Sequence, residues 1–233
     1  MMSRLVFHCL LSVCLCLTTA IRSRPQRVFQ AFMKGRTRTP LVWTAKREGV
    51  SQVLLVEWQG CPDCALYGED LVESTLKPGL GKLMDLKVIL APGAHNLDDP
   101  DPNLHKWTAC ANEVVGSRDP SYGWYHVVSC AMGIDGTEAV SSCLDKAEQT
   151  ASILKVKECM ADASKSGELV TKMHSEYEDL NVRQFPWVKV NGVDLPPPDE
   201  NGDKVVDLNK AVADYATSAG LALPEAMAGA NAL

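Results

Sequence analysis

Two cysteines separated by two residues, Cys61 and Cys64, are the side chains of this sequence best suited to chemistry. Thiol–disulfide exchange needs one thiolate that attacks a disulfide and a second thiol that resolves the mixed disulfide. A Cys-x-x-Cys pair at the beginning of a helix supplies both, because the unpaired N–H groups there lower the pKa of the first thiol. We therefore predict that Cys61 attacks and that Cys64 resolves.

Two other interpretations of the pair compete with this one. A zinc site would need a second Cys-x-x-Cys or a Cys/His pair at ligand spacing. The histidines of the main part of the chain show no such pairing: they are His95, His105, His126 and His174. We predict no metal and no cofactor, and a purely structural Cys61–Cys64 disulfide stays open as the alternative.

The segments on either side of the pair predict a β-α-β unit. Residues 53–56 form an unbroken β-favouring apolar run, which is typical of a strand buried on both faces of a sheet. After Cys64, small and apolar residues recur at helical spacing until Pro78-Gly79 ends the helix. Residues 86–91 form a second apolar strand. The cysteine pair thus lies where a strand leads into a helix.

The rest of the chain predicts helices and then a hairpin. Residues 100–103 have the composition of a loop, and helices are expected near 121–132, 137–150 and 166–180. Asn191-Gly192 between two β-favouring segments predicts a hairpin turn, and a last helix is expected to begin with Asp207 as its N-cap. This order predicts an α/β, thioredoxin-like fold with a helical insertion, about 106–180, between the β-α-β unit and the C-terminal β-hairpin and helix.

Phe185-Pro186 stands at the start of the predicted hairpin. In a thioredoxin-like fold a cis proline begins the strand that faces the dithiol, and the residue before it offers backbone hydrogen bonds to a substrate chain. A trans proline that opens an edge strand is the ordinary alternative. We predict that Pro186 is cis and that Phe185 and Pro186 bind substrate.

The N-terminal segment predicts entry into the secretory pathway. Arg4 precedes an apolar run that is too short to span a bilayer, so residues 1–20 are read as a signal peptide and no membrane anchor is expected. Residues 21–47 are a basic propeptide, an organelle transit segment or a disordered arm; 48–220 form the folded domain, and 221–233 a disordered tail. The protein is expected in a lysosome or vacuole, or secreted.

Four cysteines outside the pair are predicted to form structural disulfides. Three of the nine cysteines lie in the predicted signal peptide, which leaves an even number, as expected in an oxidising compartment. The four are Cys110, Cys130, Cys143 and Cys159. They allow three pairings, of which we favour Cys110–Cys130 with Cys143–Cys159.

The charge of the chain is unevenly distributed. Residues 1–47 carry nine Lys or Arg and no acid, which leaves 23 − 9 = 14 basic against 29 acidic residues in 48–233. An acidic body makes nucleic acid an unfavourable partner, and we predict none.

The order of several motifs resembles the gamma-interferon-inducible lysosomal thiol reductase (GILT) family. After the Cys-x-x-Cys helix come "LKVILAPGAHN", Trp107 before Cys110, "VVSCAMG", "VKECMADA" and "FPWVKVNG", and the resemblance spans residues 52–195. The Cys-Gln-His-Gly signature of the family stands here as Cys-Ala-Asn-Glu, at 110–113.

This resemblance implies that Cys61 and Cys64 are a catalytic dithiol, that Pro186 is the active-site proline, and that disulfides in other proteins or unfolded polypeptides are reduced at acidic pH. A small-molecule thiol is expected to recycle the dithiol. Two alternatives stay open: a DsbA-like oxidase or isomerase, which differs in reduction potential, and a secreted, disulfide-stabilised binding module with an inert Cys61–Cys64 bridge.

Overall fold

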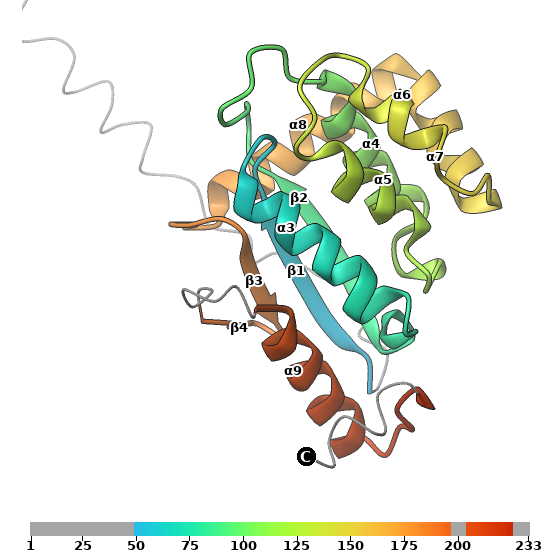
Figure 1. Cartoon of the computed structure of the whole chain (residues 1–233), viewed down its shortest axis with the longest axis vertical. Helices are drawn as coiled ribbons and strands as arrows, with labels where there is room; N and C mark the ends of the chain where they lie inside the picture. Colours follow the sequence, from blue (N-terminus) through green and yellow to red (C-terminus); the bar gives the residue numbers. More distant parts are fainter. Residues whose placement is uncertain (1–48, 197–203, 226–233) are drawn as a thin grey trace, which may run out of the picture. The chain divides into compact units, whose positions relative to one another are not determined.

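A four-stranded mixed sheet forms the centre of the fold (Figure 1). The structure is a computed structural model, and it describes residues 49–196 and 204–225. The strands lie in the order β2-β1-β3-β4, with β1 parallel to β2 and antiparallel to β3. Their bounds are β1 (Ser51–Glu57), β2 (Met84–Leu90), β3 (Trp187–Val190) and β4 (Val193–Asp194).

The central strand β1 is buried as its sequence predicts. The side chains of residues 53–56 are at most 2% exposed, because β1 is paired on both edges and covered on both faces. In the parallel register Val53 lies opposite Leu86 and Glu57 opposite Leu90. Glu57 therefore lies at the end of β1 from which the chain leaves the core and continues to the cysteine pair.

Helix α3 (Pro62–Leu71) follows the pair and continues as a π-helical turn, Val72–Leu76. It packs against α9 (Lys204–Ser218), which also contacts β1 and β3, and Figure 1 shows both helices in front of the sheet. The predicted start of the last helix was wrong: α9 begins at Lys204, and Asp207 lies in its first turn. An aspartate is favourable at either place, since the positive end of the helix dipole extends over the first turn.

Five helices form the insertion between β2 and β3. They are α4 (Pro102–Val114), α5 (Gly123–Ala131), α6 (Ala139–Leu144), α7 (Ala151–Ala161) and α8 (Ala163–Asp179). The loop expected at 100–103 was partly wrong, because Asp101 caps α4 by accepting from the Asn103 N–H at 2.8 Å, and a proline fits the first helical position. The sequence also did not predict α7.

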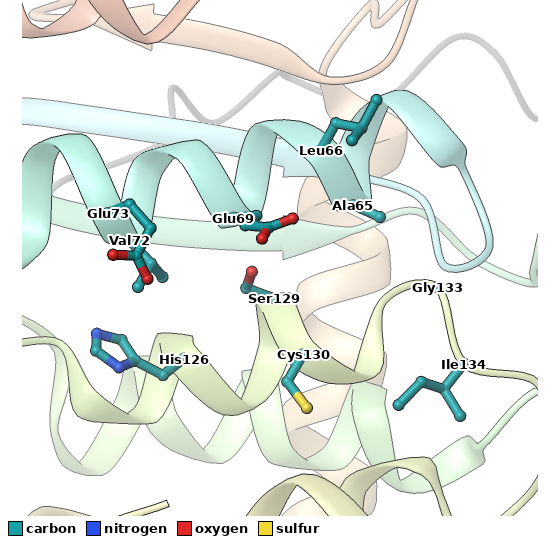
Figure 2. Close-up of a pocket in the computed structure, with 10 residues that line it drawn as sticks. All are labelled: Ala65, Leu66, Glu69, Val72, Glu73, His126, Ser129, Cys130, Gly133 and Ile134. Atoms are coloured by element: carbon teal, nitrogen blue, oxygen red, sulfur yellow. The ribbon is translucent and has the colours of Figure 1, made fainter.

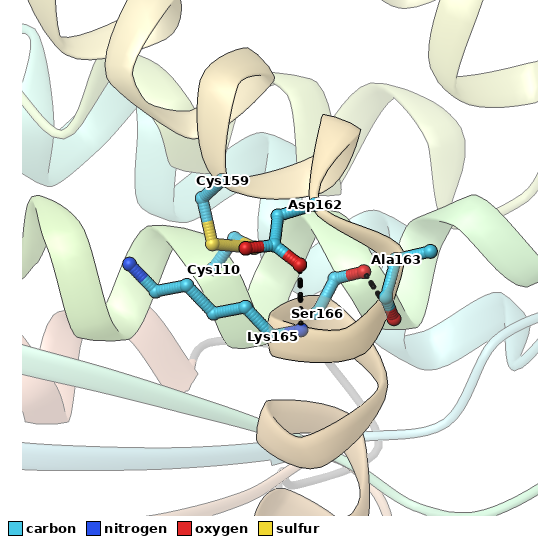
Figure 3. Close-up of a disulfide and its surroundings, with 6 residues drawn as sticks. All are labelled: Cys110, Cys159, Asp162, Ala163, Lys165 and Ser166. Carbon is cyan, nitrogen blue, oxygen red and sulfur yellow. Dashed lines mark hydrogen bonds between the residues drawn. A yellow bond between two sulfur atoms is a disulfide. The ribbon is translucent and has the colours of Figure 1, made fainter.

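The favoured disulfide pairing was wrong: the bonds are Cys110–Cys159 and Cys130–Cys143. Helix α4 packs against α7, and α5 packs against α6, so the cysteines of each packed pair face one another. Figure 3 shows the Cys110–Cys159 bond beside Asp162, whose side chain caps α8. All four cysteines are bonded, as predicted, but helix packing decides the partners.

The hairpin and the order of elements identify the architecture. Asn191 and Gly192 have φ angles of 49° and 86°, as a type I′ turn requires, so the predicted turn is confirmed. A β-α-β unit, a set of inserted helices, a β-hairpin and a final helix that packs beside α3 make up the thioredoxin arrangement. The chain has the predicted α/β, thioredoxin-like fold with a helical insertion.

Several predictions fall outside the described residues. The signal peptide at 1–20, the basic segment at 21–47 and most of the tail, 226–233, are among them. Within the described ranges, none of the helices is both long and apolar enough to cross a membrane.

Candidate active site

The cysteine pair lies at the junction between β1 and α3, as predicted. Cys61 is the N-cap residue of α3, and its backbone N–H donates to the Trp58 carbonyl at 3.0 Å. Cys64 lies one turn into the helix, and both cysteines are free thiols. Of the two, Cys61 is thus the one placed where the helix N–H groups are unpaired.

Gly60 fixes the turn that precedes the pair. Its φ is +79°, and a Cβ atom at this position would lie 1.9 Å from the carbonyl oxygen of His95. The Gly60 N–H donates to the Met132 carbonyl at 2.8 Å, and the His95 N–H donates to the Gln59 carbonyl at 2.6 Å. The loop after β2 and the end of α5 therefore hold this turn from two sides, and only glycine fits between them.

The Cys64 thiol is enclosed beneath Cys61. Cys64 is 0% exposed, whereas Cys61 is 7% exposed. Burial raises the pKa of Cys64 far above its ordinary value, and the Glu57 carboxylate and a hydrogen bond with Cys61 raise that pKa further. Cys64 consequently keeps its proton until a base accepts it, which suits the resolving thiol.

Glu57 is a component of the site that the sequence reasoning missed. It is 0% exposed at the end of β1, and burial raises its pKa to about 8, although a hydrogen bond from Tyr125 lowers it. The Tyr125 hydroxyl donates to Glu57 Oε1 at 3.0 Å, while Oε2 has no partner among the described residues. One feature of the sequence could have indicated this role. Glu57 is an acidic residue that directly follows the apolar run predicted to be a strand buried on both faces, and it lies four residues before Cys61.

Two buried tyrosines complete the surroundings of this carboxyl group. Tyr67 on α3 and Tyr125 on α5 are 5% and 0% exposed, and burial together with Glu57 raises the pKa of each phenol. The Tyr67 hydroxyl has no hydrogen-bond partner in the part of the chain that the structure describes. Both phenols therefore stay neutral, and a tyrosine in either protonation state cannot supply a positive charge to offset a charge on Glu57.

Phe185 and Pro186 lie beside the turn that carries the dithiol. The Phe185–Pro186 bond is cis, as predicted, and Trp187 directly after it pairs with Val56 of β1. The Phe185 ring lies 5.4 Å from the Trp58 ring and is stacked on Tyr177 at 6.3 Å. The sheet therefore brings the predicted substrate-binding residues to the same end of β1 as Cys61.

A groove of about 430 Å³ runs between α3 and α5 (Figure 2). Figure 2 shows Ala65, Glu69 and Glu73 on the α3 side, and Ser129 and Cys130 on the α5 side. The remaining lining residues are Leu66, Val72, His126, Gly133 and Ile134. Neither Cys61 nor Cys64 lines the groove, but Ala65 directly follows Cys64, so this end of the groove lies near the dithiol.

Two histidines that appeared unrelated in the sequence meet in the fold. His174 Nε2 on α8 lies 3.0 Å from His105 Nδ1 on α4, and His105 is also hydrogen-bonded to the backbone of Gly93. Burial and the neighbouring His174 lower the pKa of His105 to about 4. Within residues 49–196 and 204–225, no three His, Cys, Asp or Glu side chains form a group that could hold a metal ion.

The chain is similar to several solved structures. No protein-family model matches the chain, and no curated protein matches it. Reduced DsbA1 from Neisseria meningitidis is 20% identical over 76% of this chain and 91% of that chain, with a TM-score of 0.46. The thiol-disulfide exchange protein alpha-DsbA2 from Wolbachia pipientis is 13% identical over 73% of this chain and 84% of that chain, also with a TM-score of 0.46.

The oxidoreductase DsbA from Xylella fastidiosa is 14% identical over 75% of this chain and 88% of that chain, with a TM-score of 0.43. Scores and identities at this level carry no functional argument, and the resemblance to the GILT family depends on the quoted motifs alone. The thioredoxin-like assignment therefore rests on the strand order, the position of the cysteine pair and the helical insertion described above.

Proposed function

We propose that the protein is a thiol–disulfide oxidoreductase that reduces disulfides in other proteins through Cys61 and Cys64. One observation carries this proposal: Cys61 is the N-cap residue of α3, and the buried Cys64 thiol is hydrogen-bonded to it next to the Glu57 carboxyl group. This arrangement holds the two thiols in contact, and burial raises the pKa of Cys64 so that it stays a thiol until the resolving step of the exchange.

In the first step Cys61 acts as the nucleophile. Its thiolate, stabilised by the N–H groups of the first turn of α3, attacks one sulfur of the substrate disulfide. The substrate S–S bond breaks, a mixed disulfide forms between Cys61 and one substrate cysteine, and the other substrate cysteine leaves as a thiolate that takes a proton from water.

In the second step Cys64 resolves the mixed disulfide. The Cys64 thiol transfers its proton to the Glu57 carboxylate, and its sulfur attacks Cys61 Sγ. The Cys61–Cys64 disulfide forms as the second substrate thiolate leaves and is protonated. Two electrons have then passed from the dithiol to the substrate disulfide, and a small-molecule thiol restores the dithiol.

The reducing direction is proposed from the resemblance of the motifs to the GILT family. Burial and Glu57 raise the pKa of Cys64 and keep it as a neutral thiol in the reduced protein. A strong oxidant of this kind has a stabilised reduced form, so equilibration of the pair with glutathione distinguishes a reductase from a DsbA-like oxidase.

Phe185 and Pro186 are proposed to hold the substrate chain, since they lie at the same end of β1 as the dithiol. The proposed location is the secretory pathway, ending in a lysosome or vacuole or outside the cell. Because burial raises the pKa of Glu57 to about 8, the proton transfer of the second step should become slower as the compartment becomes more acidic.

Insulin reduction and equilibration with glutathione test the proposal. We expect the full chain to reduce insulin disulfides with glutathione as the electron donor, Cys61→Ser to abolish this activity, and Cys64→Ser to accumulate mixed disulfides. The glutathione ratio at which half of the pair is oxidised should indicate a reducing dithiol. A Cys61–Cys64 bridge in the parent that resists reduction by glutathione would instead identify the binding module with an inert disulfide.

A further inference from the structure

We propose that the groove between α3 and α5 selects substrates in which a cysteine is followed by an apolar residue and then by basic residues. This inference rests on the proposed reductase function and names the polypeptide that the dithiol prefers. Its occupant is a substrate segment of positive charge that flanks the disulfide to be reduced.

One end of the groove lies close to the attacking cysteine, Cys61. This end is formed by Gly133 and Ile134, just after α5. The preceding residue, Met132, accepts a 2.8 Å hydrogen bond from the N–H of Gly60, which directly precedes Cys61. A substrate chain whose cysteine reaches Cys61 can therefore continue into this end of the groove.

The end of the groove near the dithiol is apolar. Ala65, Leu66 and Ile134 line it, and the Leu66 side chain is 67% exposed although it lies only two residues after Cys64. A single exposed leucine is common on protein surfaces, but at this position a bound apolar residue would gain free energy by removing the leucine from water. An apolar substrate residue next to the cysteine would bury Leu66.

The far end of the groove is acidic. Glu69 on α3 and Glu73 on the π-helical turn that continues it both line this end, and both are exposed. Glu73 has an ion pair with Lys77, whose side chain is 54% exposed, while no ion pair engages Glu69 within residues 49–196 and 204–225. The opposite wall offers no cation at neutral pH, because burial lowers the pKa of His126, and Ser129 is uncharged.

The helix sets the spacing that the groove selects. Glu69 and Glu73 are four and eight residues beyond Ala65, which places them about 6 and 12 Å along the helix axis at a rise of about 1.5 Å per residue. An extended chain advances about 3.3 Å per residue. The favoured substrate thus has Lys or Arg about two and four residues after its apolar residue.

A competing occupant is the basic N-terminal segment of the chain itself, since residues 1–47 hold nine Lys or Arg and no acid. We favour the substrate because the apolar end of the groove includes Ala65, the residue after Cys64, and is linked to Gly60 through the Met132 carbonyl. An N-terminal segment held in the groove would block the access of every peptide substrate. Its release would therefore raise the turnover of both peptides, whereas substrate selection changes the ratio between them.

The test uses the full chain and two disulfide-linked peptide dimers with the sequence Cys-Leu-Ala-Lys-Ala-Lys or Cys-Leu-Ala-Glu-Ala-Glu. Turnover is measured at low and high salt for the parent protein, for the double variant Glu69→Lys/Glu73→Lys, and for the control Glu158→Lys/Glu168→Lys, whose two sites are exposed on α7 and α8. Reduction of a small aromatic disulfide, which is too short to occupy the groove, measures the activity of the dithiol alone.

The parent should reduce the lysine peptide with a kcat/KM about ten-fold higher than the glutamate peptide at low salt, as two exposed charge pairs would give. The Glu69/Glu73 variant should reverse this preference, the control should keep it, and high salt should remove it. All proteins should reduce the aromatic disulfide equally. Leu66→Ala should slow both peptides by a similar factor.

Three results would overturn the inference. Equal turnover of both peptides by an active parent would show that the groove does not select substrates by their charge. Faster turnover of both peptides by the Glu69/Glu73 variant would identify the N-terminal segment as the occupant. Absence of turnover with the aromatic disulfide would mean that the proposed reductase function itself fails, and the inference with it.

Discussion

The Tyr125 hydroxyl donates a 3.0 Å hydrogen bond to Glu57 Oε1, and this contact joins the helical insertion to the end of the central strand. Tyr125 lies on α5, one wall of the groove, and Glu57 lies beside the buried Cys64 thiol. The insertion therefore contributes a residue to the surroundings of the dithiol, in addition to covering the sheet.

Replacement of Glu57 by Gln should slow the second step of the reaction. The amide fills the same space and can still accept from Tyr125, but it cannot accept the Cys64 proton, so we expect resolution to slow about 100-fold. In the parent the rate should rise with pH through about 8, where Glu57 ionises, and in Glu57→Gln this rise should disappear. Stopped-flow measurement of how fast a preformed mixed disulfide on Cys61 is resolved gives the pH–rate profile of each protein. The control is Glu158→Gln, because Glu158 is exposed on α7. Identical profiles would remove Glu57 from the mechanism.

Glu57 and His105 should make opposite contributions to the pH dependence of stability. The folded-state pKa of Glu57 is raised from 4.5 to about 8, so the folded protein binds more protons than the unfolded chain, and its stability falls as pH rises through this window. The folded-state pKa of His105 is lowered from 6.5 to about 4, so its contribution is lost as pH falls through that window.

Urea unfolding between pH 4 and 8 separates the two effects. Relative to the parent, Glu57→Gln should gain stability as pH rises from 4.5 to 8, with a slope of up to about 1.4 kcal/mol per pH unit. Relative to the parent, His105→Gln should gain stability as pH falls from 6.5 to 4. A pH-independent difference for either variant would contradict the corresponding shift.

The two disulfides should differ in their resistance to thiols. Cys130 is exposed and lines the groove, whereas Cys110 and Cys159 are 0% and 5% exposed. A thiolate must reach a sulfur atom to open the bond, so limiting dithiothreitol should open Cys130–Cys143 before Cys110–Cys159. Alkylation followed by mass spectrometry of the native protein gives the order. Simultaneous opening, or opening of the buried bond first, would contradict the prediction.

Gly60→Ala should destabilise the fold and impair exchange together. The Cβ atom would meet the His95 carbonyl oxygen, and the positive φ angle adds a cost of about 1–2 kcal/mol. Gly79→Ala is a matched control, because Gly79 also has a positive φ, +91°, but has open space around its Cβ position. Urea unfolding should show a larger loss for Gly60→Ala, and only this variant should lose insulin reduction. Equal losses would mean that backbone strain alone explains the glycine.

The local features of this protein could be predicted from the sequence. The apolar run at 53–56, the Cys-x-x-Cys pair and the Asn191-Gly192 turn depend on neighbouring residues, so their hydrophobic period and backbone preferences predict strand, helix start and hairpin directly. The order of these elements was sufficient to predict the thioredoxin-like arrangement and a cis Pro186 before the last strand pair.

Contacts between distant residues could not be predicted from the sequence, because they depend on how the helices pack. The disulfide partners follow from the packing of α4 on α7 and of α5 on α6, which the spacing of the cysteines along the chain does not encode. The contact between His105 and His174, the hydrogen bond from Tyr125 to Glu57, and the groove beside α3 likewise arise from helix packing. The raised pKa of Glu57 has the same origin, because burial is produced by every element packed around a residue and not by its neighbours in sequence.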